Sequence, residues 1–209
     1  MKARTANAVR TFKNNFSADV YSDGTAVNQI TGLQALVADT GTGTVGGIDS
    51  TAFPFWRNIV QSAAAPLQGG GAITPGPTTM ESLMLAAWLA VVRGDDKPDL
   101  IPCSNDYFTF FEQGQASLKR YNDTTEAEAG FVSLKYKTAD VIFDGGSGIA
   151  NQHMYMLNTD YLEIVAHQDA NMTDVPELRS VNQDAVVMPV IWQGNVICSN
   201  RSLQCVIKA

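Results

Sequence analysis

The chain has 209 residues, of which 45% are apolar and 17% are charged, and its formal net charge at neutral pH is -7. This composition is typical of a folded protein with a substantial core, and it excludes a disordered chain. The negative net charge also excludes a protein whose whole surface binds nucleic acid, because an acidic surface repels phosphates.

A helix is predicted from Lys2 to Tyr21, and the sequence Ser22-Asp23-Gly24 ends it. Apolar side chains at steps of three and four form one stripe along this helix: Val9, Phe12, Phe16 and Val20. The helix starts at Met1 without a capping residue, as though the chain had been entered partway through an element.

The stretch DTGTGTVGGID, residues 39–49, contains Gly41-x-Gly43-x-x-Gly46, which is the spacing of a dinucleotide-binding loop. Such a loop needs a helix after it and an acid about 20 residues further on. Pro54 interrupts any following helix, and no Asp or Glu occurs between Asp49 and Glu81. We therefore predict a loop or hairpin whose glycines adopt positive backbone angles, and no phosphate at this loop.

A flexible connection is predicted at residues 66–77, followed by a largely buried helix over 78–93. The hydroxyls of Thr78 and Thr79 are expected to accept the first amide protons of this helix. Its apolar run from Leu83 to Val92 has ten residues, which is too short to cross a bilayer. No membrane segment is expected, and no apolar signal segment opens the sequence.

A short strand at 98–104 and a helix over 104–121 come next, with Ser104-Asn105 available as the cap. From Gly130 onward the sequence favours strands, and Gly194-Asn195 is predicted as a turn or bulge. Helices before residue 122 and strands after it predict an α+β fold.

Two histidines, His153 and His167, could form a catalytic or metal cluster with Cys103. No HxxxH spacing supports such a cluster, so structural roles are favoured. A small enzyme that uses His153 or His167 with Cys103 remains an alternative hypothesis. Cys198 and Cys205 belong to no CxxC pair, which favours buried, inert thiols in a reduced intracellular protein.

Paired acids are also weak candidates. Asp95-Asp96 lies in a charged turn, and Glu126 with Glu128 is typical of a solvated loop. The first 16 residues carry four basic side chains and no acid: Lys2, Arg4, Arg10 and Lys13. A DNA-binding module that uses this basic helix is therefore a second alternative. We predict no catalytic, cofactor-binding or metal site.

The whole chain resembles the major capsid protein of tailed bacteriophages and prophages. The resemblance rests on an ordered set of segments and on no single catalytic signature: NNFSADVYSDGTAVNQITGLQALV, GTVGGIDSTAFPFWRN, RGDDKPDLI, GFVSLKYKTADVIFDGG, HMYMLNTDYLEI and SVNQDAVVMPVIWQGNVICSNRSLQCVIKA.

The resemblance implies the coat fold of these phages, with a spine helix and a β-sheet in a peripheral domain and a compact mixed axial domain. It places the end of the spine helix and its turn at 1–35, the axial domain at 36–159 and peripheral strands at 160–192. Residues 193–209 would then return to the axial domain. The glycine loop would be a turn at the entrance to that domain.

The implied function is that of a non-enzymatic subunit of an icosahedral head shell, assembled with copies of itself in pentamers and hexamers. Scaffold and portal proteins would be further partners, packaged DNA only an indirect contact, and no membrane would be involved. The protein would be made in the host cytoplasm and reside in the virion. Family members carry an N-terminal arm and an extended loop ahead of this sequence, so the resemblance also implies a truncated copy.

Overall fold

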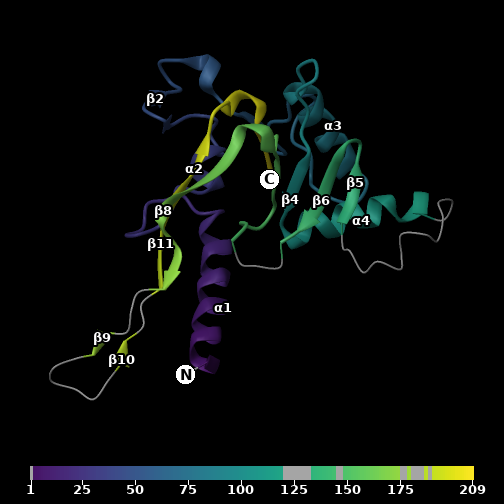
Figure 1. The fold of residues 1–209 in the computed structure, drawn as a ribbon. Coiled ribbons are helices and arrows are strands. Elements are labelled where there is room, and N and C mark those ends of the chain that lie inside the picture. The colour runs from purple at the N-terminus through teal and green to yellow at the C-terminus, as the bar shows by residue number, and fades with distance from the viewer. Residues whose placement is uncertain (1, 120–132, 145–147, 175–177, 180–185, 188–189) are drawn as a thin grey trace.

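The computed structural model describes residues 2–119, 133–144, 148–174, 178–179, 186–187 and 190–209. The chain divides into a compact half, built on a sheet, and a long limb formed by a helix beside a two-stranded ribbon (Figure 1). The described helices are α1 (Lys2–Asp19), α2 (Leu33–Leu36), α3 (Met80–Val91) and α4 (Asn105–Lys119). Three short 3-10 turns join strands and loops: η1 (Pro54–Trp56), η2 (Thr159–Tyr161) and η3 (Arg201–Leu203).

The compact half is organised by a mixed sheet with the strand order β3-β12-β7-β4-β6-β5. Its strands are β3 (Ile59–Ser62), β4 (Leu100–Cys103), β5 (Ser133–Tyr136), β6 (Ala139–Phe143), β7 (His153–Met156) and β12 (Cys205–Lys208). The last strand, β12, lies between β3, to which it is parallel, and β7, to which it is antiparallel. The end of the chain therefore joins segments that lie far apart in the sequence.

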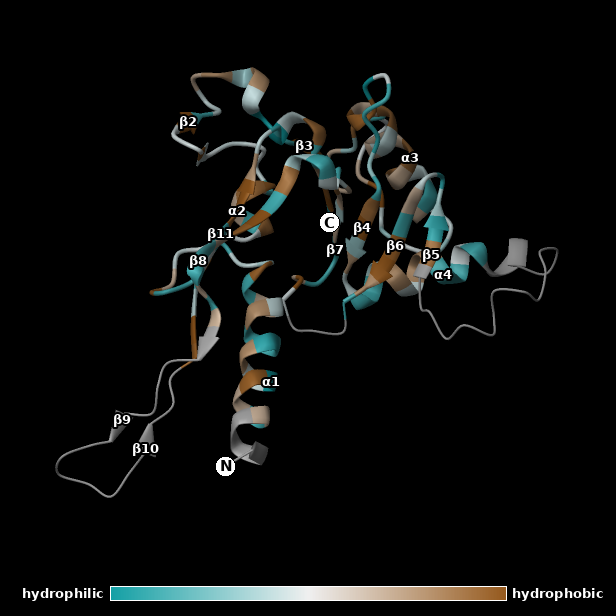
Figure 2. Ribbon diagram, in the orientation of Figure 1, coloured by the Kyte–Doolittle hydropathy of each residue, from teal (hydrophilic) through white to brown (hydrophobic). Residues whose placement is uncertain are grey.

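Each face of this sheet carries its own core, because successive side chains of a strand point to opposite faces. On β12, Cys205 and Ile207 belong to a core beneath α3 and α4, which we call the helix-side core. Val206 belongs to a core on the opposite face, which includes Leu33 and Leu36 of α2 and which we call the loop-side core. Figure 2 shows the apolar residues concentrated in α2 and in the central strands.

Helix α3 begins at Met80 and ends at Val91, which confirms the predicted helix over 78–93. Thr79 is the N-cap residue of α3, as expected, but the expected cap hydrogen bond is absent. The Thr79 hydroxyl donates to the carbonyl of Thr74 at 2.8 Å and accepts no amide proton of the helix. Before α4, the Ser104 hydroxyl accepts from the amide of His153 across the sheet. The hydroxyls of Thr79 and Ser104 therefore both bond to backbone groups outside the helices that they precede.

The limb combines α1 with the antiparallel strands β8 (Leu162–Asp174) and β11 (Val190–Cys198). The register shifts between Trp192 and Gly194, which confirms the predicted bulge. A Cβ on Gly194 would lie 2.4 Å from the carbonyl oxygen of Val165, so only glycine fits this position. Further out, β9 (Leu178–Arg179) pairs with β10 (Val186–Val187).

A small hairpin precedes η1, with β1 (Thr44–Val45) paired to β2 (Ile48–Asp49) through a turn at Gly46-Gly47. Both turn glycines have positive φ, at 61° and 78°, as a tight two-residue hairpin turn requires. Pro54 occupies the first position of η1, where its missing amide proton costs no hydrogen bond. The described part of the chain contains no helix with the length and apolarity needed to cross a membrane.

Candidate functional site

The glycine loop encloses the side chain of Arg201, which is fully buried. Arg201 Nε donates to the carbonyl of Leu36 at 2.6 Å, and Nη2 donates to the carbonyl of Thr42 at 3.0 Å. Arg201 Nη1 lies 3.3 Å from both the carbonyl of Gly43 and the hydroxyl of Ser50. The guanidinium therefore links η3 to three separate segments of the N-terminal half.

The acceptors around Arg201 are neutral, so burial is incompletely offset and lowers the pKa of the guanidinium below its usual value. Arginine remains protonated even so, since its unperturbed pKa is above about 12. The carbonyl dipoles replace the water that the cation loses on burial. We call this arrangement the Arg201 cage.

The hydrogen bonds of the glycine loop differ from those of a dinucleotide-binding loop. A dinucleotide loop directs backbone amide protons at a phosphate, whereas this loop directs the carbonyls of Thr42 and Gly43 at a cation. Gly41, Gly43 and Gly46 have φ values of 70°, 117° and 61°, which confirms the predicted positive angles. That the loop binds no phosphate remains a prediction.

Sequence reasoning missed Arg201, although the sequence contains a signal. Arg201 is the only charged residue between Asp184 and Lys208, within an otherwise apolar and neutral stretch. A lone charge in such a stretch indicates either an exposed tip or a buried cation with dedicated acceptors. The acceptors could not be identified, because three are backbone carbonyls and one is the Ser50 hydroxyl, all at least 151 residues away in the sequence.

His153 is engaged through both ring nitrogens. Nε2 lies 2.9 Å from Asp39 Oδ2, and Nδ1 lies 2.8 Å from the carbonyl of Asn151. The hydrogen bond with Asp39 raises the pKa of His153 above its usual value and lowers the pKa of Asp39. This pair attaches the start of the glycine loop to β7.

Cys103 and His153 do not form a catalytic dyad. Cys103 lies in the helix-side core, and its thiol donates to the carbonyl of Ile142 at 3.1 Å. His153 lies on the opposite face of the sheet, because Met154 next to it faces the helix-side core. Burial raises the pKa of Cys103 to about 12, so the reactive thiolate is essentially absent at neutral pH.

The other candidates are dispersed as well. His167 is exposed on the limb, where its Nδ1 accepts from the amide of Asp169. Cys205 is buried as predicted, whereas Cys198 is only half-buried because it lies near the base of the exposed ribbon. Among the described residues no three metal-ligating side chains cluster together.

The acidic and basic candidates have no common site. Asp96 accepts a hydrogen bond from the Tyr161 hydroxyl at 2.9 Å, a structural role that Asp95 does not share. Glu126 and Glu128 lie outside the described residues. Arg10 and Lys13 are exposed on α1, and the side chains of Lys2 and Arg4 lie outside the described part.

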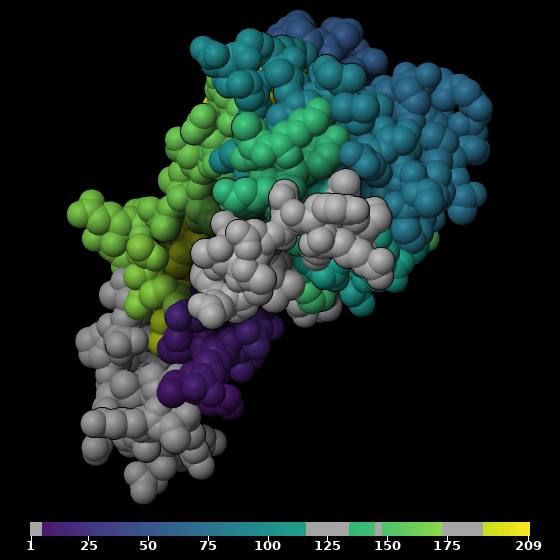
Figure 3. Space-filling model, turned by 90° about the vertical axis from the view of Figure 1, so that its right-hand side faces the viewer, coloured from purple at the N-terminus to yellow at the C-terminus, as the bar shows by residue number. Residues whose placement is uncertain are grey.

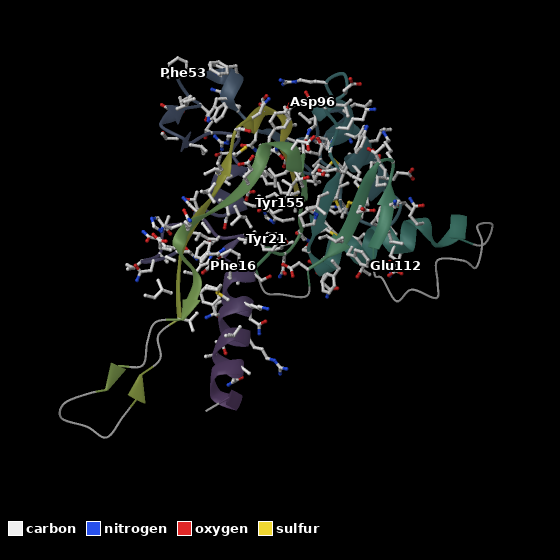
Figure 4. The ribbon with its side chains drawn as sticks, viewed as in Figure 1. Phe16, Tyr21, Phe53, Asp96, Glu112 and Tyr155 are labelled. Carbon is white, nitrogen blue, oxygen red and sulfur yellow. The ribbon has the colours of Figure 1, made fainter. Side chains whose placement is uncertain are left out.

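The limb carries aromatic side chains at the contact between its helix and its ribbon. Phe16 of α1 contacts Trp192 of β11 edge to face, with ring centroids 4.8 Å apart. A hollow of about 180 Å³ beside this pair is lined by Phe12, Lys13, Phe16, Met172 and Trp192. Figure 4 shows Phe16, Tyr21 and Tyr155 following one another from α1 towards the sheet. Figure 3 shows the limb projecting from the compact half.

The ribbon exposes large apolar side chains on both of its strands: Ile164, Val165, Ile191 and Ile197. A two-stranded ribbon buries too little apolar surface to be stable by itself in water. Val165 and Ile197 are diagonal neighbours across the two strands, and adjoining exposed apolar groups commonly mark a surface that contacts another protein. The limb is therefore the candidate interaction surface.

No protein-family model matches the sequence, and no curated protein matches it. Among solved structures, the chain is similar to one described as the cyanophage A-1(L) capsid asymmetric unit, with a TM-score of 0.64 and 18% sequence identity. The match covers 99% of this chain and 68% of that chain. The predicted class is thereby confirmed: this is an α+β chain with the fold of a phage capsid protein.

Proposed function

We propose that the chain is a structural subunit of the head shell of a tailed phage or prophage, assembled from copies of itself and without enzymatic activity. The observation that carries this proposal is the fold match over 99% of the chain. The exposed apolar ribbon supports it, because such a surface is stabilised when a neighbouring subunit covers it. The separation of Cys103 from His153 gives no support to the small-enzyme alternative.

Within this proposal, the six-stranded sheet with α3 and α4 is the axial domain, made by residues 36–159 and 193–209. The limb, made by residues 1–35 and 160–192, is the peripheral domain. The pairing of β11 with β8 continues to Cys198, which supports a boundary a few residues later than 193. Pentamers and hexamers, and contacts with scaffold or portal proteins, follow from the family resemblance and belong to the proposal.

Two experiments test this function. Phage particles purified from a culture that carries the gene should contain peptides of this chain as a major component in mass spectrometry. Sedimentation velocity of the purified protein should show oligomers whose fraction rises with concentration. A chain that is absent from particles and strictly monomeric at every concentration would contradict the proposal.

The DNA-binding alternative is tested by titrating the protein with duplex DNA at low salt. We expect no salt-dependent binding beyond that of a charge-matched acidic protein. Binding that disappears when Arg10 and Lys13 are replaced by alanine would favour the alternative.

A further inference from the structure

Two exposed apolar groups lie on opposite sides of the compact half. The first, which we call the aromatic pair, consists of Phe53 and Phe55 at η1. The second, which we call the leucine stripe, consists of Leu85 and Leu89 on the outer face of α3. Figure 1 places α3 and the β2 hairpin at opposite upper ends of the molecule, and Figure 4 labels Phe53 at the hairpin end.

The contacts of the sheet agree with this placement. Helix α3 covers the helix-side core, to which Leu83, Met84 and Ala87 contribute. The loop before η1 is attached to the other side, where Ser50 joins the Arg201 cage. The aromatic pair and the leucine stripe therefore cannot contact each other within one subunit.

The aromatic pair is held rigidly. The rings of Phe53 and Phe55 contact each other edge to face, 6.0 Å apart, and their side chains are 51% and 69% exposed. Trp56 Nε1 donates to the carbonyl of Val45 at 3.1 Å, and Arg57 Nε donates to the carbonyl of Ser50 at 2.9 Å. Because the backbone is already fixed, ordering these rings at an interface costs little further entropy.

The leucine stripe is the one apolar part of the outer face of α3. Leu85 and Leu89 stand one helical turn apart and are 43% and 69% exposed. Leu67, also half exposed, lies near the first turn of α3, because Gln68 donates to the Ser82 hydroxyl at 3.3 Å. Aliphatic side chains around a helix ridge form a shallow surface suited to flat aromatic rings.

The flanking charges are complementary. Arg57 follows the aromatic pair, and Glu81 precedes Leu85 by one helical turn. Both residues are exposed. If two aromatic pairs met each other, Arg57 would face Arg57, which like-charge repulsion disfavours. Glu81 shares the outer face of α3 with Leu85 and Leu89, so a contact between an aromatic pair and a leucine stripe can bring Arg57 close to an opposite charge.

We propose that the aromatic pair of one copy docks on the leucine stripe of the next copy, so that compact halves associate head to tail. A contact between two different patches repeats from copy to copy, and it closes into a ring when the rotation per copy permits. This inference rests on the proposed function, because it requires the chain to self-associate. The aromatic pair and the leucine stripe would form the buried centre of this interface, and other residues would form its polar rim.

Cysteine cross-linking tests the direction of this contact. Phe55→Cys and Leu89→Cys in one chain should give a ladder of cross-linked oligomers after mild oxidation. Either substitution alone should give no more cross-linking than the unmodified chain, and a mixture of the two single variants should stop at a dimer. Cys103 and Cys205 are buried, but Cys198 is half-buried and could cross-link by itself. The unmodified chain measures that background.

Sedimentation of serine variants gives a second measurement. Phe55→Ser and Leu89→Ser should each weaken association at least tenfold, whereas Val27→Ser should not change it, although Val27 is 91% exposed. Arg57→Glu should weaken association, and combining it with Glu81→Arg should restore it. Circular dichroism should show unchanged folding for the serine variants, because the replaced side chains are exposed. Arg57→Glu also loses the hydrogen bond to the Ser50 carbonyl, so the recovery with Glu81→Arg is the result that identifies a charge effect.

The outcomes separate this inference from the proposed function. If the unmodified chain associates but the two cysteines do not cross-link and the serine variants associate normally, the head-to-tail contact is wrong and self-assembly stands. If the unmodified chain stays monomeric at every concentration, both are contradicted. Dimers formed by Phe55→Cys alone would show a symmetric contact and also overturn the inference.

Discussion

Arg201 connects four parts of the chain through one side chain. Its partners are the end of α2, the glycine loop and Ser50, and it is itself held by η3 just before β12. A guanidinium suits this position, because it offers five donors in a rigid plane, whereas an ammonium is a point charge. The cage therefore fixes the glycine loop more firmly than its own short hairpin could.

Replacing Arg201 by methionine should strongly destabilise the fold. The variant removes the donor from the carbonyls of Leu36 and Thr42, and each buried carbonyl left unpaired costs about 1–3 kcal/mol. The Gly43 carbonyl keeps its hydrogen bonds from the amide and the hydroxyl of Ser50. We expect a loss of roughly 3–5 kcal/mol in the free energy of unfolding, and about half of that loss for Arg201→Lys. Urea denaturation measures both values.

The matched control for the Arg201 variants is Arg10→Met, which removes an exposed arginine from α1. This change should alter the free energy of unfolding by less than about 0.5 kcal/mol. A loss for Arg201→Met as small as that of the control would show that the carbonyls find other donors, and that the cage is not what fixes the loop.

The pair of His153 and Asp39 should make the stability of the fold depend on pH, with losses at high pH and at low pH. The folded pKa of His153 is above its usual value of 6.5, so its contribution is complete below pH 6.5 and is lost as the pH rises through the folded pKa. The folded pKa of Asp39 is below its usual value of 3.8, so its contribution is complete above pH 3.8 and is lost as the pH falls through the folded pKa. Lys208 opposes the shift of His153.

His153→Gln should therefore reduce stability more at about pH 5.5 than at about pH 9. The difference between the urea midpoints of the variant and the unmodified chain measures this effect. His167→Gln, which changes an exposed histidine on the limb, serves as the control for replacing a histidine as such. A His153 titration midpoint below 6.5 in NMR would contradict the assignment of the pair.

At the scale of elements, periodicity predicted most of the helices and strands. The helical spacing of Phe12 and Phe16 correctly predicted that α1 is a helix with one apolar face. The apolar run from Leu83 correctly predicted that α3 is a largely buried helix. Thr79 was correctly predicted as the N-cap residue, but its predicted cap hydrogen bond is absent, because the hydroxyl donates to the carbonyl of Thr74 and sequence spacing does not reveal that partner. Local pattern predicts an element well and its hydrogen-bond partners poorly.

The packing of α1 on the ribbon should depend on the contact between Phe16 and Trp192. Their rings meet edge to face at 4.8 Å, an arrangement worth about 0.5–1.5 kcal/mol beyond the area that it buries. In a double-mutant cycle, Phe16→Ala and Trp192→Ala should show a coupling energy of that size. Phe53→Ala combined with Trp192→Ala should be additive, because Phe53 lies at η1, far from the limb. Additive behaviour of Phe16 with Trp192 would mean that the ribbon is held by other contacts.

At the scale of the whole molecule, the order of strands could not be read from the sequence. β12 pairs with β3, almost 150 residues earlier, and with β7, about 50 residues earlier. The alternation of residues from Cys205 to Lys208 predicts a strand, but it does not identify the strands that pair with it. The α+β class and the resemblance to phage capsid proteins were predicted because they depend on the order of segments, and the fold match confirms the class.

Amide hydrogen exchange should reveal the unequal stability of the two halves. β12 and β7 lie between two cores, so their amides are released only by global unfolding. Residues 6–11 of α1 are largely exposed and lie outside both cores, so their amides should exchange fastest among the helices. Mass spectrometry of the monomer should resolve this order. Under the proposed function neighbouring copies cover the limb, so on assembly protection should increase along α1 and β11 and stay constant in β12. Equal protection of α1 and β12 in the monomer would instead show that the limb is stable alone, which would remove the exposed ribbon as a reason to expect assembly.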